Sequence, residues 1–345
     1  MMGRWIVIFM ISAALVAGLG GRVAAAFDEA ADGVIAHTRV DLVPEYRVIS
    51  PGQGFRVGVR MRMDPDWHVY WRNPGDSGLA PRLEWHSAGA VVRVGALHWP
   101  YPERIDAEGL TTYGYYREVV LLQELMLDSR AVVPGQIDLT VDVSWLACKV
   151  ECVPGQARLR LPMTVGERME RDPRFDTDAA GSLARLPAET LPWPAQAGRQ
   201  GREVRLSWPA EAVLSGAEFF PLRSDLLSHT AVQDFLRDGD RQVLILQLSD
   251  LYTPDPAGTG LRLSGVLVTR PAGAGPGDGR AYGLDVPVME VAAPSAGGAA
   301  EPAGGRRAAS AGTMGVGLAL VFAFAGGVIL KDRKSTRLNS SHVSQ

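Results

Sequence analysis

The chain has 345 residues, and its 38 acidic and 35 basic side chains leave a formal net charge of only −3. This near balance gives no support for binding to nucleic acid, which needs a clustered excess of positive charge. The length allows two domains and excludes a miniprotein that depends on disulfides. With 39 glycines, 23 prolines and 7% aromatic residues, the composition suits an all-β protein rich in turns.

Residues 1–26 have the features of a secretory signal peptide. Arg4 provides the positive charge, residues 5–19 form an uncharged and mostly apolar run, and residues 24–26 are small alanines suited to cleavage. An uncleaved anchor is the weaker alternative, because the apolar run is short for a membrane span. We therefore expect the mature chain to begin near Phe27, outside the cytoplasm.

Residues 27–165 are expected to form a first β-sandwich. Residues 55–63 alternate apolar and polar side chains, as a half-buried strand does, and residues 119–127 predict a more apolar strand. Residues 137–143 alternate again and lead into the first cysteine, and residues 158–161 predict a strand that leaves the second. The two cysteines should therefore lie where two strands meet, on the rim of the sandwich.

Cys148 and Cys152 are the two cysteines of the chain. A disulfide between them would stabilise the fold by only about 2 kcal/mol, compared with ~4.7 kcal/mol for a loop of about 100 residues. Short loops also strain the sulfur geometry, and strained disulfides are easier to reduce. We interpret Cys148 and Cys152 as a reversible dithiol/disulfide, and hence as the candidate catalytic residues.

Two other uses of the pair stay open on the residues alone. It could be a structural disulfide of a secreted domain. It could also bind a soft metal such as Cu(I), with a histidine such as His68 or His98 completing the ligands. Within the motif, Lys149 favours a thiolate and Glu151 opposes it. Pro154 lacks a backbone donor and is expected to stop a strand from running through the motif.

A segment rich in aromatic side chains lies between the early strands. Trp67, His68, Tyr70 and Trp71 precede a turn-rich tail that starts at Asn73. One interpretation is that the two tryptophans anchor the core. The other is that the segment is a loop that caps the cysteine pair or docks a partner. On this interpretation, the candidate site residues are Trp67, His68, Tyr70 and Trp71.

Residues 166–200 are expected to connect two domains, with one short helix over residues 176–186. Residues 201–292 should form a second β-sandwich without a cysteine or a catalytic cluster. Its isolated histidine, His229, is interpreted as a surface or core residue. The alternating or apolar runs predict strands at residues 203–208, 243–248, 261–268 and 282–291.

The C-terminal part changes character three times. Residues 293–312 are mainly Ala, Gly, Pro and Ser, the composition of a linker. Residues 313–330 carry no charge and just reach the length of a transmembrane helix. Residues 331–345 resemble translated sequencing-adapter sequence and are excluded from the fold. The upstream domains are therefore expected in the periplasm, tethered to the inner membrane.

Three motifs together resemble the DsbD family of membrane protein-disulfide reductases, and its ScsB-like branch most closely. They are the aromatic segment at residues 67–78, the Trp-Leu-x-Cys-x-x-x-Cys-Val-Pro motif at residues 145–154, and the apolar residues 323–330. The resemblance covers about residues 30–330. Residue by residue, only Cys148 and Cys152 match the family's redox pair, and the better-known DsbD branch spaces its cysteines more widely.

The resemblance implies two immunoglobulin-like β-sandwich domains in tandem, preceded by the signal peptide and followed by one truncated transmembrane helix. In the family, a multi-helix membrane domain and a thioredoxin-like domain follow. By analogy, Cys152 would attack a partner's disulfide and Cys148 would resolve the mixed disulfide, with no cofactor. The expected partners are periplasmic thioredoxin-like or disulfide-isomerase proteins, including those of cytochrome c maturation and peroxide defence.

Overall fold

The computed structural model describes residues 34–291, with the exception of residues 89, 129–134, 211–212, 254–259 and 276–277. These residues form an all-β fold, as the sequence predicts, with two helices of four residues each. The predicted signal peptide, linker, transmembrane helix and adapter-like tail lie outside the described residues. No helix in the described part of the chain has the length and hydropathy of a membrane span.

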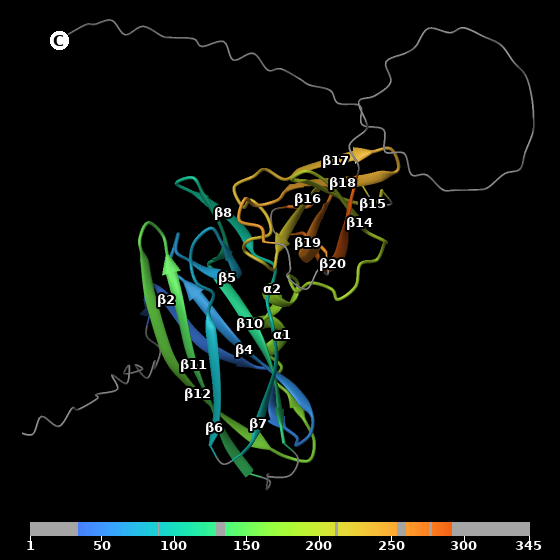
Figure 1. Cartoon of the computed structure of the whole chain (residues 1–345). Coiled ribbons are helices and arrows are strands. Elements are labelled where there is room, and N and C mark those ends of the chain that lie inside the picture. Colours follow the sequence, from blue (N-terminus) through green and yellow to red (C-terminus); the bar gives the residue numbers. More distant parts are fainter. Residues whose placement is uncertain are drawn as a thin grey trace, which may run out of the picture. The chain divides into compact units, whose positions relative to one another are not determined.

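The first set of strands, drawn from blue to green in Figure 1, forms a sandwich. Its strands are β1 (Val34–Ile35), β2 (Thr38–Pro44), β3 (Tyr46–Ile49), β4 (Gly54–Met63), β5 (His68–Gly75), β6 (Arg82–Ala88), β7 (Val92–His98), β8 (Glu103–Ala107), β9 (Leu110–Tyr116), β10 (Glu118–Leu127), β11 (Gly135–Cys148), β12 (Cys152–Val165) and β13 (Glu170–Arg171). One sheet has the order β1-β2-β4-β10-β7. The other has the order β13-β3-β12-β11-β5-β9-β8, with β6 also paired to β11.

The inner faces of these two sheets pack against each other because apolar side chains alternate along the facing strands. Met61 of β4 and Leu121 of β10 come from one sheet, and Val143 of β11 and Tyr115 of β9 come from the other. All four are buried in one hydrophobic cluster. The strands predicted at residues 55–63, 119–127, 137–143 and 158–161 correspond to β4, β10, β11 and β12, so these predictions are confirmed.

The aromatic segment predicted as a loop is instead strand β5. Val69 and Trp71 belong to the core cluster of the sandwich. His68 and Tyr70 point to the opposite side of the sheet, since side chains alternate along a strand, and they too are buried. Both faces of β5 are therefore covered, so the polar–apolar alternation that marks a half-buried strand is missing.

Strands β11 and β12 form a long antiparallel hairpin whose register ends with Cys148 opposite Cys152. Trp145 faces the core and lies opposite Gly155. A Cβ at Gly155 would come within 2.3 Å of the Trp145 ring. A glycine is therefore needed at this position, and the tryptophan fixes the end of the hairpin that carries the cysteines.

Strand β12 runs through Pro154, contrary to the prediction that this proline stops a strand. Pro154 is paired with Leu146 of β11. On its other edge, β12 pairs among the described residues only with β3, at Thr164 and Val165. Proline is tolerated at such an edge because no ladder hydrogen bond is lost there.

The second set of strands, drawn from yellow to orange, has the order β16-β19-β20-β14-β15-β18-β17. Leu206 of β15 and Leu244 of β18 pack with Phe219 of β16 and Leu267 of β19 in a second buried cluster. The four predicted strands are confirmed as β15, β18, β19 and β20. The bounds are β14 (Gln196–Gln200), β15 (Glu203–Pro209), β16 (Leu214–Pro221), β17 (Asp234–Asp238), β18 (Arg241–Gln247), β19 (Arg262–Pro271) and β20 (Arg280–Glu290).

The connector contains two short helices, α1 (Phe175–Asp178) and α2 (Ala180–Leu183), and the prediction of a single helix is wrong. Ala179 between them has φ −105° and ψ 1°, outside the helical region. Gly181 and Ser182 are weak helix formers and give little drive to continue the helix. Phe175 nevertheless anchors the connector in a small buried cluster on the first sandwich.

The two sandwiches meet through a shared apolar cluster. Phe220 of β16 packs edge-on against Trp71 of β5 and Tyr113 of β9, with ring centroids 6.2 Å and 5.3 Å apart. Val266 and Val268 of β19 belong to the same cluster. The core of the first sandwich therefore extends into the second.

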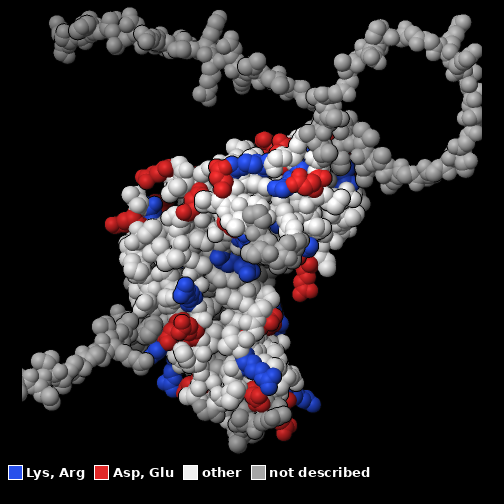
Figure 2. All heavy atoms as spheres, viewed as in Figure 1, with Lys and Arg blue, Asp and Glu red and all other residues white. Residues whose placement is uncertain are grey.

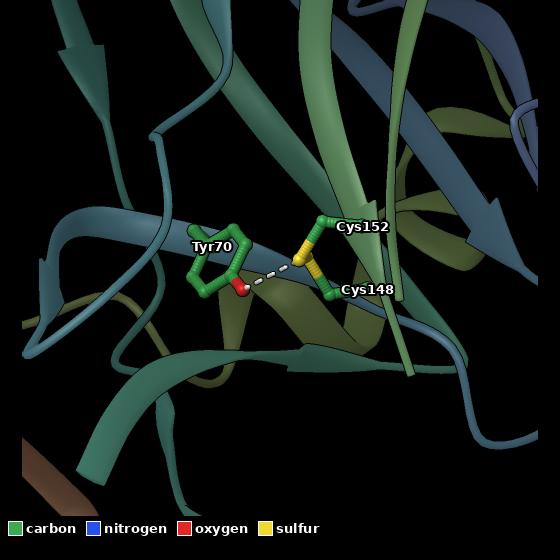
Figure 3. Close-up of a disulfide and its surroundings, with 3 residues drawn as sticks. All are labelled: Tyr70, Cys148 and Cys152. Atoms are coloured by element: carbon green, nitrogen blue, oxygen red, sulfur yellow. Dashed lines mark hydrogen bonds between the residues drawn. A yellow bond between two sulfur atoms is a disulfide. The ribbon is translucent and has the colours of Figure 1, made fainter. Parts of the chain in front are cut away.

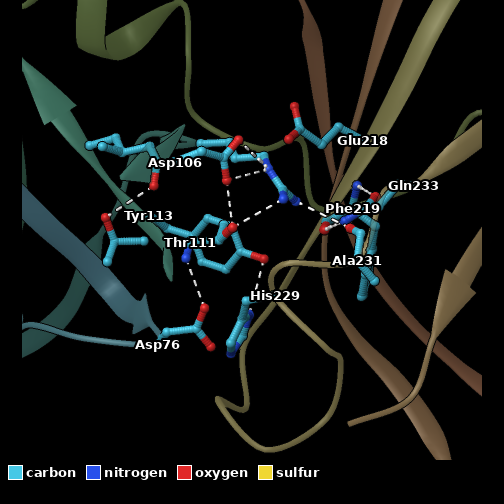
Figure 4. Close-up of polar contacts among 12 residues, drawn as sticks. Asp76, Asp106, Thr111, Tyr113, Glu218, Phe219, His229, Ala231 and Gln233 are labelled. Atoms are coloured by element: carbon cyan, nitrogen blue, oxygen red, sulfur yellow. Dashed lines mark hydrogen bonds and ion pairs between the residues drawn. The ribbon is translucent and has the colours of Figure 1, made fainter. Parts of the chain in front are cut away.

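Polar contacts strengthen the same junction (Figure 4). Asn73 Nδ2, in β5, donates to the Pro221 carbonyl at 2.8 Å. His229, which is only 5% exposed, lies with Nδ1 3.1 Å from Tyr113 Oη and with Nε2 2.7 Å from the Ser224 carbonyl. His229 is thus a core residue rather than a surface residue, the two alternatives given by the sequence. Through Asn73, the second sandwich also holds the C-terminal half of β5.

Candidate functional site

Cys148 and Cys152 form a disulfide at the turn of the β11–β12 hairpin, with their Cα atoms 4.1 Å apart. Pro154 has no N–H, so its pair with Leu146 is not hydrogen-bonded. Pairs alternate along an antiparallel ladder, so the cysteines two residues further on are also a non-hydrogen-bonded pair, the type with the closest side chains. The register of the hairpin therefore brings the two sulfurs together, where two strands meet as predicted.

The two cysteines differ in their access to solvent. Cys148 is 3% exposed, whereas Cys152 is an exposed residue. The turn between them carries Val150, which is 92% exposed. Lys149 of the same turn forms an ion pair with Asp66, with Nζ 3.0 Å from Oδ2. One cysteine of the pair is thus open to an incoming protein, and the other is enclosed.

A row of four side chains crosses the sheet at the disulfide. Tyr116 of β9 lies opposite His68 of β5, which lies opposite Cys148 of β11, which lies opposite Cys152 of β12. Residues directly opposite each other share one face of the sheet, with Cβ atoms about 4.5–5.5 Å apart. We call these four residues the cysteine row.

Tyr70 reaches the disulfide from the same face (Figure 3). Its hydroxyl lies 3.8 Å from Cys152 Sγ, and it must be the donor because a disulfide sulfur carries no hydrogen. Burial raises the pKa of Tyr70, with a smaller contribution from Tyr116, so the hydroxyl keeps its proton. Gly78 packs on the ring with φ +107°, and a Cβ there would come within 2.2 Å of Tyr70. The turn after β5 therefore covers this tyrosine.

His68 is 7% exposed and packs edge-on between Tyr70 and Tyr116, at ring-centroid distances of 5.1 Å and 5.5 Å. Among the described residues, neither ring nitrogen has a hydrogen-bond partner. Burial lowers the pKa of His68, so the ring is neutral near neutral pH. The site thus holds an uncharged imidazole beside the buried cysteine.

The other candidate residues lie away from the sulfurs. Trp71 lies in the core, and Trp67 stacks on His37 with ring centroids 3.8 Å apart. His98 lies on the other sheet, where its Nε2 is 2.7 Å from Glu124 Oε1. In the described part of the chain, no three His, Cys, Asp or Glu side chains are grouped to hold a metal. A capping or docking role for the aromatic segment stays a prediction.

Sequence reasoning did not place Tyr116 beside His68. That position depends on the register between β5 and β9, for which a single sequence gives no signal. Figure 2 shows acidic and basic side chains intermixed on the face in view, rather than a patch of one sign.

Comparisons with known proteins agree with this description. Residues 39–164 match the family model described as thiol:disulfide interchange protein DsbD, N-terminal. The structure of the N-terminal periplasmic domain of ScsB from Proteus mirabilis is 19% identical, with a TM-score of 0.52, and the match covers 73% of this chain and 94% of that one. The N-terminal domain of DsbD from Neisseria meningitidis in the reduced form is 17% identical, with a TM-score of 0.22 and coverage of 38% and 90%. A comparison with curated proteins gave no match.

The match to the family covers His68, Tyr70 and both cysteines, so the resemblance stated from the motifs is confirmed. The likeness to the ScsB domain spans more of the chain and fits the tandem arrangement of β domains. The family and the disulfide together support thiol–disulfide exchange in general terms. The match to the DsbD N-terminal family model lies within the first sandwich, at residues 39–164.

Proposed function

We propose that this chain provides the periplasmic thiol–disulfide exchange module of a membrane protein-disulfide reductase. The observation that carries the proposal is the asymmetric cysteine pair: an exposed Cys152 is bonded to a buried Cys148 at the tip of a hairpin, within a domain that matches the DsbD N-terminal family model. A pair kept only for stability has no need to present one of its cysteines to solvent.

In the proposed reaction, the reduced protein starts as a dithiol. The Cys152 thiolate attacks one sulfur of a partner's disulfide, and the partner's other sulfur leaves as a thiolate. Cys148 then attacks Cys152 Sγ, which restores the Cys148–Cys152 disulfide and releases the partner's second sulfur. Two electrons pass to the partner, and no cofactor takes part. The Tyr70 hydroxyl, 3.8 Å from Cys152 Sγ, donates a hydrogen bond that favours the Cys152 thiolate.

The proposed partners are periplasmic thioredoxin-like or disulfide-isomerase proteins. Electrons would reach Cys148 and Cys152 from the membrane and thioredoxin-like domains that accompany this region in the family, and the module would be tethered to the inner membrane. The ScsB domain that shares the fold is itself described as periplasmic. The exposed turn with Val150 offers a small apolar contact for a partner.

The test uses the reduced full chain and an oxidised thioredoxin-like protein. The Cys148→Ser variant should accumulate a mixed disulfide with the partner, because its resolving thiol is missing, and the Cys152→Ser variant should not. The reverse result would move the attack to Cys148. Absence of exchange in the wild type, or a reduction potential below about −300 mV, would favour a structural disulfide instead.

A further inference from the structure

His68 is a buried titratable group that the proposed exchange does not yet use. Within the part of the chain that the structure describes, both its nitrogens lack hydrogen-bond partners, as do the indole nitrogens of Trp71 and Trp145. An indole nitrogen is only a donor, whereas a neutral imidazole can accept a proton. His68 is also the cross-strand neighbour of Cys148, on the same face of the sheet. It therefore lies beside the one cysteine that must react while enclosed.

The groups around His68 do not prevent its ring from accepting a proton. Tyr70 and Tyr116 flank the ring, and burial raises the pKa of each hydroxyl, so both stay neutral. The charges nearest in the sequence lie on turns at the edge of the site, where Lys149 is paired with Asp66 and Glu151 is exposed. The ring thus faces aromatic side chains and sulfur rather than a fixed charge.

The exchange reaction creates a need for a base at this position. The nucleophile in each step is a thiolate. Cys152 can lose its proton to solvent because it is exposed, but Cys148 is 3% exposed. Burial in apolar surroundings disfavours a thiolate. An adjacent imidazole that takes the proton is the usual way to activate such a group.

We propose that His68 accepts the proton of Cys148 when the mixed disulfide is resolved; this inference rests on the proposed exchange function. The Cys148 S–H bond breaks and its proton moves to a ring nitrogen of His68. The Cys148 thiolate then bonds to Cys152 Sγ, and the bond from Cys152 to the partner sulfur breaks. The partner leaves as a thiolate, which takes the proton back from the imidazolium directly or through water.

The test separates the two thiol steps with dithiobis-nitrobenzoate, a small disulfide whose coloured thiolate is released once by each cysteine. Reduced full chain is mixed with the reagent, and release is followed over time as a function of pH. In His68→Gln, the second release should slow by about 100-fold near neutral pH, while the first keeps its rate. The second rate should recover only at a pH well above the ordinary thiol pKa of about 8.5, because burial shifts the unaided ionisation of Cys148 to higher pH.

His98→Gln is the matched control, because it makes the same substitution at a histidine on the other sheet, where Nε2 contacts Glu124 rather than the cysteines. It should keep both rates and their pH profile. An unchanged second release in His68→Gln would overturn the proposal, as would equal slowing of both steps. The reagent needs no protein partner. A wild type that shows both releases but reduces no thioredoxin-like protein would contradict the exchange function and leave the role of His68 intact.

A measurement on the wild type covers the case in which His68→Gln does not fold. The Cε1–H resonance of His68, assigned from its contacts with Tyr70 and Tyr116, is followed by NMR against pH in the oxidised and reduced proteins. In the reduced protein the resonance should show a second titration step at alkaline pH, where Cys148 ionises next to the ring, and the oxidised protein should lack that step. Identical pH profiles in both states would overturn the proposal.

Discussion

Two buried histidines mark two regions of this protein, and they differ in what surrounds them. His229, at the junction of the sandwiches, has both nitrogens within hydrogen-bond distance of fixed partners, the Tyr113 hydroxyl and the Ser224 carbonyl. His68, in the cysteine row, has no such partner among the residues that the structure describes. Both pack edge-on against tyrosine rings. Burial alone therefore does not tell the two apart. Fixed partners give His229 a structural role, and their absence leaves His68 available for chemistry.

The largest effect on stability is expected from a change that breaks the junction between the two sandwiches. The His229→Ala change removes a buried ring and leaves the Tyr113 hydroxyl and the Ser224 carbonyl without their partner. We expect a loss of about 3 kcal/mol in the free energy of unfolding, measured by urea denaturation. His68→Gln should cost far less, because His68 makes no hydrogen bond that is lost. A similar loss in both variants would remove the distinction between the two histidines.

The next effect displaces Tyr70 from its position beside the disulfide. The Gly78→Ala change forces a Cβ into the Tyr70 ring and strains a backbone with φ +107°, at a cost of about 1–3 kcal/mol. A displaced Tyr70 should also let a small thiol reduce the disulfide faster. Gly109→Ala is the control, since Gly109 has φ +81° with nothing within 4 Å of a Cβ. If both variants are reduced at the wild-type rate, Tyr70 does not shield the sulfurs.

A smaller effect appears in the pH dependence of stability. The pKa of His68 is lowered in the folded protein by burial, whereas its unfolded value is about 6.5. The folded state therefore binds fewer protons, so the stabilisation is complete above about pH 6.5 and is lost as the pH falls toward the folded pKa. In the oxidised His68→Phe variant this loss is absent. Parallel unfolding free energies for wild type and variant across this range would contradict the assignment.

The smallest effect on stability concerns the exposed turn. Val150→Ser changes a side chain that is 92% exposed, so the free energy of unfolding should shift by less than about 0.5 kcal/mol. Exchange with a thioredoxin-like protein should slow, because an apolar contact is removed, while exchange with dithiobis-nitrobenzoate keeps its rate. Equal protein exchange rates before and after the change would exclude this turn from the docking surface.

The strands that the sequence predicts are those with a clear alternation of apolar and polar side chains or a continuous apolar run. Strands β4 and β11 alternate clearly, and both were found by that pattern. Strand β5 was taken for a loop because His68 and Tyr70 are buried on one side while Val69 and Trp71 are buried on the other. Its aromatic residues indicated a functional site, but their pattern did not indicate a strand.

The candidate site was predictable only in its local part. The position of Cys148 and Cys152 at the meeting of two strands follows from residues that are adjacent in the chain. The pairing of His68 with Cys148 joins residues 80 positions apart and depends on sheet register. The effect of Pro154 was misjudged for a related reason: whether a missing N–H matters depends on whether another strand lies alongside.

The hairpin that carries the cysteines has a consequence for the redox cycle. Its backbone ladder pairs every residue from Gly135 to Cys148 with one from Cys152 to Val165, and that ladder does not depend on the sulfur–sulfur bond. After reduction, the two thiols remain tethered face to face at a high effective concentration. The cycle between dithiol and disulfide can therefore proceed on a nearly stationary backbone, and each return to the oxidised form is an intramolecular closure.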